Sequence, residues 1–150
     1  MRFKIALFIL VVSFPVIAQQ GNEKLQTLRM SIINIDNEKI PVNLELACSE
    51  SEHTYGLMYR DKLDENSGML FVFPDDGYRN FWMKNTRIPL SIAYIDAKGK
   101  ILEIYDMKPL DTSITYPSKF ACRYALEVNK GWFKKHNIRT GSVLFIEGIK

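Results

Sequence analysis

Short apolar segments separated by turn residues occur along most of this chain of 150 residues. Between residues 40 and 46, apolar side chains alternate with polar or turn-prone ones, the period-two pattern of a strand with one buried face. Residues 69–73 are apolar without interruption, as in a strand buried on both faces. Turn residues at 36–39 and 96–99 predict two hairpins. Together these features predict a mostly β fold: a single-domain β-sandwich of the jelly-roll kind, or a partly closed barrel.

Only one or two short helices are expected. Ser49 and Glu52 form a capping box, which predicts a helix over about residues 50–59. A second short helix is expected over residues 132–136. Residues 107–119 show no consistent period, so we expect an ordered loop that crosses one end of the domain.

The first 18 residues have the features of a secretory signal peptide. Arg2 and Lys4 precede a mainly apolar stretch over residues 5–14, and small or branched residues follow up to Ala18. An apolar stretch of this length is too short to span a bilayer, which takes about 20 residues. We therefore expect residues 1–18 to be removed and the mature chain to be exported, into the periplasm or the extracellular space.

The mature chain is expected to begin with a loose leader over residues 19–27, followed by one domain over residues 28–150. Removing the two basic residues of the signal peptide lowers the formal net charge from +3 to +1. Nucleic-acid binding needs a clustered excess of basic residues, which is not present in the sequence. We expect the domain to be a monomer. We also expect that it does not span the membrane, because no later apolar run is long enough.

Two cysteines, Cys48 and Cys122, are the only ones in the chain. An exported chain enters an oxidising space in which disulfides persist, so the two could form a bridge. They could equally be two separate thiols that pack as small apolar residues. Sequence separation does not reveal spatial distance, and both possibilities remain open.

Residues 81–90 combine bulky apolar side chains with polar ones. As a strand over residues 81–85, the segment would place two sets of side chains on opposite faces: Phe81, Met83 and Asn85 on one, and Trp82, Lys84 and Thr86 on the other. Both faces begin apolar and end polar, as expected where a strand leaves the core at the rim of a cleft. We expect the loop over residues 107–119 to border that cleft, with Tyr116 as its main contact.

Several motifs in this region recur together elsewhere. They are Gly56-Leu57-Met58-Tyr59-Arg60, Gly68-Met69-Leu70-Phe71, Phe81-Trp82-Met83-Lys84-Asn85-Thr86, Ile88-Pro89-Leu90 and Leu126-Glu127. In this order they resemble the bacterial and archaeal family called domain of unknown function 192, over about residues 40–147. The resemblance implies a single β-rich domain, often exported, for which no activity is established. The family usually reads Pro-Leu-Asp where this chain has Pro89-Leu90-Ser91, so a carboxylate is missing at that position.

Eight residues are candidates for ligand binding: Arg60, Trp82, Lys84, Asn85, Thr86, Ser91, Tyr116 and Glu127. Arg60 has two interpretations: it complements the dipole at the end of the first helix, or it binds a carboxylate of a ligand or of Glu127. Asn85 and Thr86 could contact a ligand or satisfy backbone groups of a turn.

The sequence contains none of the common catalytic or cofactor motifs, and its two histidines, His53 and His136, have the setting of surface residues. We therefore predict no catalytic residue, no cofactor and no metal. The expected function is binding of a small ligand or an envelope component through a cleft near residues 81–90. One alternative is a hydrolase or lyase acting on an envelope polymer. Another is a Cu(I)-binding module that uses methionine thioethers such as those of Met58, Met69 and Met83.

Overall fold

The computed structural model describes residues 24–146 and residue 149. The expected signal peptide, residues 1–18, and the first part of the expected leader, residues 19–23, lie outside the described residues. Strand β1 begins at Thr27, which was expected to be the last residue of the leader.

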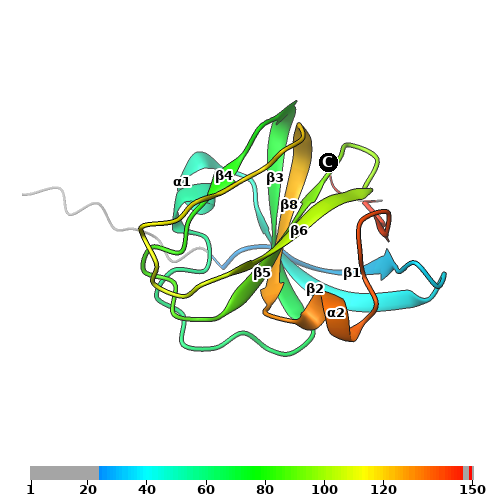
Figure 1. The fold of residues 1–150 in the computed structure, drawn as a ribbon, viewed down its shortest axis with the longest axis horizontal. Helices are drawn as coiled ribbons and strands as arrows, with labels where there is room; N and C mark the ends of the chain where they lie inside the picture. Colours follow the sequence, from blue (N-terminus) through cyan, green and yellow to red (C-terminus); the bar gives the residue numbers. More distant parts are fainter. Residues whose placement is uncertain (1–23, 147–148, 150) are drawn as a thin grey trace, which may run out of the picture.

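Most of the described chain forms one sheet of seven strands in the order β6-β5-β8-β3-β2-β1-β9. Its strands are β1 (Thr27–Ile33), β2 (Lys39–Ala47), β3 (Ser67–Gly77), β5 (Leu90–Ile95), β6 (Ile101–Met107), β8 (Cys122–Asn129) and β9 (Val143–Leu144). The sheet curls into a half-barrel (Figure 1). Neighbouring strands are antiparallel, except for β2 and β3, which are parallel. The predicted mostly β fold is confirmed, in its partly closed form.

Both predicted hairpins are present. Strands β1 and β2 pair antiparallel across the turn at residues 34–38, and β5 and β6 pair across the turn at residues 96–99. Asp96 stabilises the second turn, because its carboxylate accepts hydrogen bonds from the backbone N–H groups of Lys98 and Lys100, both at 2.9 Å.

The sheet is covered on both faces. Alternate side chains of β8 enter two different core clusters: Leu126 and Val128 pack into the first, with Trp132 and Phe133, whereas Ala125 packs into the second. The second core cluster also contains Met69, Phe71, Met83, Ile92 and Tyr94. Strand β5 is buried along its whole length, as a strand between two core layers must be.

Two short helices are present, as predicted. Helix α1 (Glu50–Tyr55) has the expected capping box, in which Ser49 accepts a hydrogen bond from the Glu52 backbone N–H at 3.3 Å. Helix α1 is shorter than predicted because the chain turns at Gly56, with φ +48°. Helix α2 (Trp132–Lys135) follows β8. Within the described residues, no helix has the length and apolarity needed to cross a membrane.

The prediction of a strand over residues 81–85 is wrong. Strand β4 consists of Asn80–Phe81 only, and it pairs with β7 (Tyr116–Pro117) in a small second sheet. After Phe81 the chain leaves the strand and turns at Lys84 and Asn85, where Asn85 has a left-handed backbone conformation with φ +54°.

The two cysteines do not form a disulfide. Cys48 is exposed after the end of β2, whereas Cys122 is buried at the start of β8. The Cys122 thiol lies 3.6 Å from the carbonyl oxygen of Gly77 and donates to it, so it packs as a small buried group.

Candidate functional site

The turn that follows β4 is fastened to the segment after helix α1. The Asn85 carbonyl accepts a hydrogen bond from the Tyr59 backbone N–H at 2.9 Å, and the Asn85 side-chain amide donates to the Tyr59 hydroxyl at 2.7 Å. Within the turn, the Thr86 N–H donates to the Met83 carbonyl at 3.2 Å. Two loops that are 26 residues apart in sequence are thereby held together.

Several aromatic rings on these two loops and at the end of helix α1 are exposed to solvent. Trp82 is 47% exposed and Tyr59 is 55% exposed. The rings of Tyr55 and Tyr59 are 5.8 Å apart, and the Lys84 ammonium lies 5.3 Å from the centre of the Trp82 ring. We call Tyr55, Tyr59, Trp82, Lys84 and Asn85 the aromatic turn surface.

Buried neighbours hold the aromatic turn surface in place. Met83 is fully buried in the second core cluster. Phe81 packs edge-on against Phe71, with ring centres 4.8 Å apart, and against Tyr94 at 5.9 Å. Phe81 is partly buried and Met83 is fully buried, whereas Trp82 and Lys84 are exposed, so the expected split is present, although a turn rather than a strand produces it.

Thr86 does not belong to this surface. It is only 5% exposed, and its hydroxyl donates to the Lys84 carbonyl at 3.1 Å. Its own carbonyl accepts from the Leu110 N–H at 3.0 Å. Of the two roles that the sequence allowed, ligand contact or hydrogen bonding within a turn, Thr86 thus has the second. The expectation that Thr86 shares a face with Trp82 is wrong.

The loop between β6 and β8 lies beside this segment, as expected. Phe81 and Tyr116 are register partners in the small sheet. The Tyr116 hydroxyl accepts a hydrogen bond from the Lys108 backbone N–H at 2.9 Å, and its carbonyl accepts one from the Tyr94 hydroxyl. These contacts of Tyr116 fasten the loop to the domain.

Arg60 forms an ion pair that the sequence did not reveal. Its guanidinium donates to both carboxylate oxygens of Glu45, at 2.5 and 2.7 Å, and this contact raises the pKa of Arg60. Arg60 lies beyond the end of helix α1 and does not pair with Glu127, so both proposed contacts within the protein are wrong. No local pattern pointed to Glu45 as the partner, because Glu45 lies on strand β2 and Arg60 lies in the segment after helix α1.

Glu127 is buried in the middle of β8 and is 4% exposed. Its register partners are Met69 on β3 and Ile92 on β5, both fully buried in the second core cluster. Within the described residues, its carboxyl forms no hydrogen bond with another side chain or with the backbone. Burial away from water raises the pKa of Glu127 to about 8. The side chain is therefore mainly a neutral acid at pH 7.

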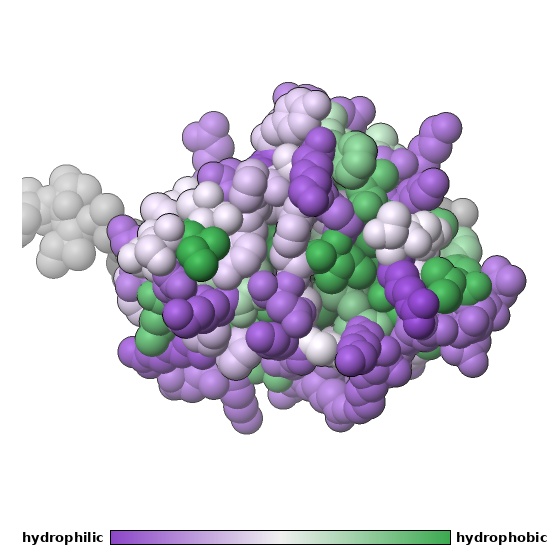
Figure 2. All heavy atoms as spheres, in the orientation of Figure 1, coloured by the Kyte–Doolittle hydropathy of each residue, from purple (hydrophilic) through white to green (hydrophobic). Residues whose placement is uncertain are grey.

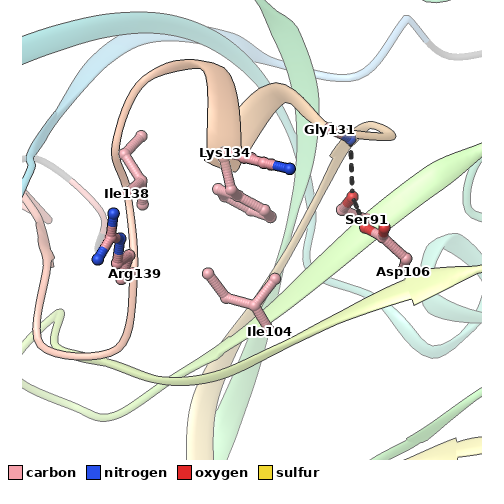
Figure 3. A pocket seen from close by; sticks show the side chains of 8 residues that line it. Ser91, Ile104, Asp106, Gly131, Lys134, Ile138 and Arg139 are labelled. Carbon is pink, nitrogen blue, oxygen red and sulfur yellow. Dashed lines mark hydrogen bonds between the residues drawn. The ribbon is translucent and has the colours of Figure 1, made fainter.

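Ser91 lies in a different environment, opposite Asp106 in the β5–β6 pairing. The Ser91 hydroxyl donates to the Asp106 carboxylate at 2.5 Å and accepts from the Gly131 N–H at 3.2 Å (Figure 3). Asp106 thus places a carboxylate next to residue 91, the position at which the family resembled by this sequence usually has aspartate. Asp106 was not among the candidate residues. Its only sequence signal was its place in the β5–β6 hairpin.

A hollow of about 220 Å³ lies beside Ser91 and Asp106. We call it the Ser91 hollow. Its other lining residues come from β6, from the residue before helix α2, from that helix and from the segment after it: Ile104, Gly131, Phe133, Lys134, Ile138 and Arg139 (Figure 3). A smaller hollow of about 180 Å³ lies at Arg29, Pro41, Val42, Asn43 and Asn66. Neither hollow is lined by Trp82 or Lys84, which lie on an exposed surface instead.

Neither histidine has the setting of a metal ligand. One ring nitrogen of His53 lies 3.0 Å from the Ala47 carbonyl oxygen and 3.1 Å from that of Val72. His136 packs against the ring of Trp132, with centres 4.6 Å apart. Among residues 24–146 and 149, no group of three or more His, Cys, Asp or Glu side chains is placed to hold a metal ion.

The fold and these surfaces define a small, mostly β domain with an exposed aromatic surface and a separate charged hollow. The chain belongs to the DUF192 family, described as "Uncharacterized ACR", whose model matches residues 31–146. This confirms the family predicted from the motifs. Among curated proteins, none matches the chain.

Two solved structures are similar to this chain. One is a protein described as a candidate transcription regulator from Sinorhizobium meliloti 1021, with 30% identity and a TM-score of 0.81 over 83% of this chain and 97% of that one. The other is a protein of unknown function from Novosphingobium aromaticivorans DSM 12444, with 26% identity and a TM-score of 0.77 over 83% of this chain and 89% of that one.

Proposed function

We propose that this chain is an exported binding domain whose aromatic turn surface recognises a saccharide component of the cell envelope. The observation that carries the proposal is the exposure of the large rings of Trp82 and Tyr59 on two loops that are hydrogen-bonded to each other. Monomeric proteins seldom gather large apolar rings on one exposed surface unless that surface binds something. Here Tyr59 is held by its hydrogen bond from Asn85, and the backbone at Trp82 is anchored by its neighbour Met83, which is fully buried.

The chemistry of the surface favours a saccharide over a purely apolar ligand. Indole and phenol rings each combine a flat apolar face with a polar edge. A sugar ring has the matching combination, with C–H groups on its face and hydroxyl groups around its edge. The Lys84 ammonium adds hydrogen-bond donors and the Asn85 amide oxygen adds an acceptor beside the rings, and such convergent polar groups fix the orientation of a ligand.

Export is the second part of the proposal. It is supported by the basic, apolar and small-residue segments of residues 1–18. The description of the Sinorhizobium relative as a candidate regulator does not lead us to propose nucleic-acid binding. The mature chain would be nearly neutral, and its aromatic turn surface contains one cation, Lys84.

A hydrolase or lyase is the alternative, and it would need a titratable group at the bound substrate. Glu127 has a pKa near neutrality, but it lies among buried apolar residues and lines neither hollow. The copper alternative is weaker still. Met69 and Met83 are fully buried in the second core cluster, where a thioether fills space between apolar side chains.

Tryptophan fluorescence tests the proposal directly. The chain has two tryptophans, of which Trp82 is 47% exposed and Trp132 is 3% exposed. Titration with soluble peptidoglycan fragments should change the emission of the intact protein. A Trp82→Phe variant, which keeps Trp132, should lose that change.

Sedimentation with insoluble peptidoglycan provides the second measurement. Trp82→Ala and Tyr59→Ala should abolish cosedimentation. The matched control is Phe145→Ala, which removes an exposed ring (46% exposed) that lies beside β1, away from this surface. Equal loss in Phe145→Ala, or no binding by the intact protein, would contradict the proposal.

A further inference from the structure

The Ser91 hollow has a charge pattern that the aromatic turn surface does not use. One carboxylate, that of Asp106, and two cations, Lys134 and Arg139, line it. Among the described residues, neither Lys134 nor Arg139 forms an ion pair, and the Asp106 carboxylate is hydrogen-bonded by Ser91 alone. The hollow therefore has a formal charge of +1 that its own residues do not neutralise.

The charged groups are separated by apolar side chains. In Figure 3, Asp106 and Arg139 lie on opposite sides of the hollow, with Ile104 between them, and Lys134 projects from helix α2 toward Gly131. Phe133 and Ile138, both almost fully buried, complete the apolar part. Figure 2 shows an apolar patch over β6 that is bordered by hydrophilic side chains.

The carboxylate is fixed in position before any ligand arrives. The Ser91 hydroxyl is almost fully buried, donates to Asp106 at 2.5 Å, and is itself held by the Gly131 N–H at 3.2 Å. Ser91 uses only one carboxylate oxygen, so the other oxygen of Asp106 is available to accept a hydrogen bond. Ser91 is thus a positioning residue for Asp106.

We propose that the Ser91 hollow binds a free acidic α-amino acid. Asp106 accepts hydrogen bonds from the ligand ammonium, and Arg139 and Lys134 bind its two carboxylates. The ligand methylene groups pack on Ile104 and Phe133. At neutral pH such a ligand has one positive and two negative charges, which is the inverse of the hollow.

Size and charge together favour an acidic amino acid over simpler ligands. A hollow of about 220 Å³ is smaller than the ~300–1,000 Å³ of pockets for drug-sized molecules, so the ligand must be small. A dicarboxylate without an ammonium would offer no cation to Asp106, whose carboxylate would then face an anionic ligand. An amine with one carboxylate would leave one of the two cations without a partner.

Isothermal titration calorimetry of the purified chain tests this with three probes. L-Glutamate carries all three charges, glutarate lacks the ammonium, and γ-aminobutyrate lacks the α-carboxylate. L-Glutamate should bind at least about tenfold more tightly than either analogue, since each analogue loses a charge-assisted contact. Absence of glutamate binding, or equal affinity for glutamate and glutarate, would overturn the proposal.

Three variants connect the binding to this hollow. Arg139→Gln should weaken glutamate binding by about tenfold or more. Asp106→Asn should weaken glutamate and strengthen glutarate, because it removes the repulsion that disfavours a simple dicarboxylate. Lys98→Gln, a charge change in the exposed β5–β6 turn, is the matched control and should leave both affinities unchanged.

The variants are informative only if they fold, so circular dichroism and thermal melting accompany each titration. If Asp106→Asn does not fold, the comparison of the three probes on the unmodified chain still decides the question. Glutamate binding that survives Arg139→Gln unchanged would place the ligand elsewhere and overturn the proposal. The outcome is independent of peptidoglycan binding, because the aromatic turn surface shares no residue with the hollow.

Discussion

The buried acid Glu127 should make the stability of this protein depend on pH. Its pKa is about 8 in the folded chain, against a usual value of 4.5. Between these two values the folded chain holds a proton that the unfolded chain has released. The free energy of unfolding therefore falls as pH rises through this window, by about 1.4 kcal/mol per pH unit. From pH 5 to pH 8 the loss from this one group should be roughly 3–4 kcal/mol.

Glu127→Gln isolates this effect, because the amide has nearly the same shape and does not titrate. The amide and the neutral carboxyl are both buried without partners among the described residues, so the substitution should change the free energy of unfolding little at low pH. The variant should therefore be about as stable as the unmodified chain at pH 5 and more stable at pH 8, by roughly 3–4 kcal/mol.

Urea unfolding at half-unit pH steps, analysed by linear extrapolation, measures the two curves. Glu50→Gln, an exposed glutamate of helix α1, is the control and should keep the pH dependence of the unmodified chain. If Glu127→Gln shows that dependence too, Glu127 is ionised in the folded protein and the assignment of a neutral buried acid is wrong.

The remaining predictions concern packing and processing. Met83→Ala should lower the free energy of unfolding by about 2–5 kcal/mol because Met83 is fully buried, whereas Lys84→Ala should stay within about 0.5 kcal/mol; urea unfolding that shows equal losses would make Lys84 a buried structural residue. Gly68→Ala should destabilise by at least about 1–3 kcal/mol, since its Cβ would lie 2.4 Å from the Glu127 carbonyl oxygen; an unchanged melting temperature would contradict that close approach. N-terminal sequencing of the protein from its native cells should begin at Gln19, and a chain that retains Met1 would refute export.

Local chemistry made much of the fold predictable. The alternation over residues 40–46 and the apolar run at residues 69–73 were sufficient to indicate β2 and β3, because strand periodicity depends only on neighbouring residues. The capping box at Ser49 fixed the start of helix α1 for the same reason. The β5–β6 hairpin followed from its turn residues.

Contacts between distant segments were not predictable in this way. Arg60, in the segment after helix α1, pairs with Glu45 on strand β2, and Tyr59 is hydrogen-bonded to Asn85 of a distant turn. The two cysteines lie in different environments, one exposed and one buried. Each of these facts depends on the order of the strands in the sheet. Local periodicity in the sequence carries no information about that order.

The pairing of Ser91 with Asp106 shows what the sequence alone determines and what only the tertiary structure decides. The sequence alone determined that residues 96–99 form a turn and that the segments on either side of it are strands. Continuing the register Ile95↔Ile101 without a shift would place Tyr105 opposite Ser91. An irregularity between Tyr94 and Ile95 moves the register by one residue and brings Asp106 there instead. A shift of one residue reverses which face every later side chain occupies, so only the tertiary structure could decide that a carboxylate lies beside Ser91.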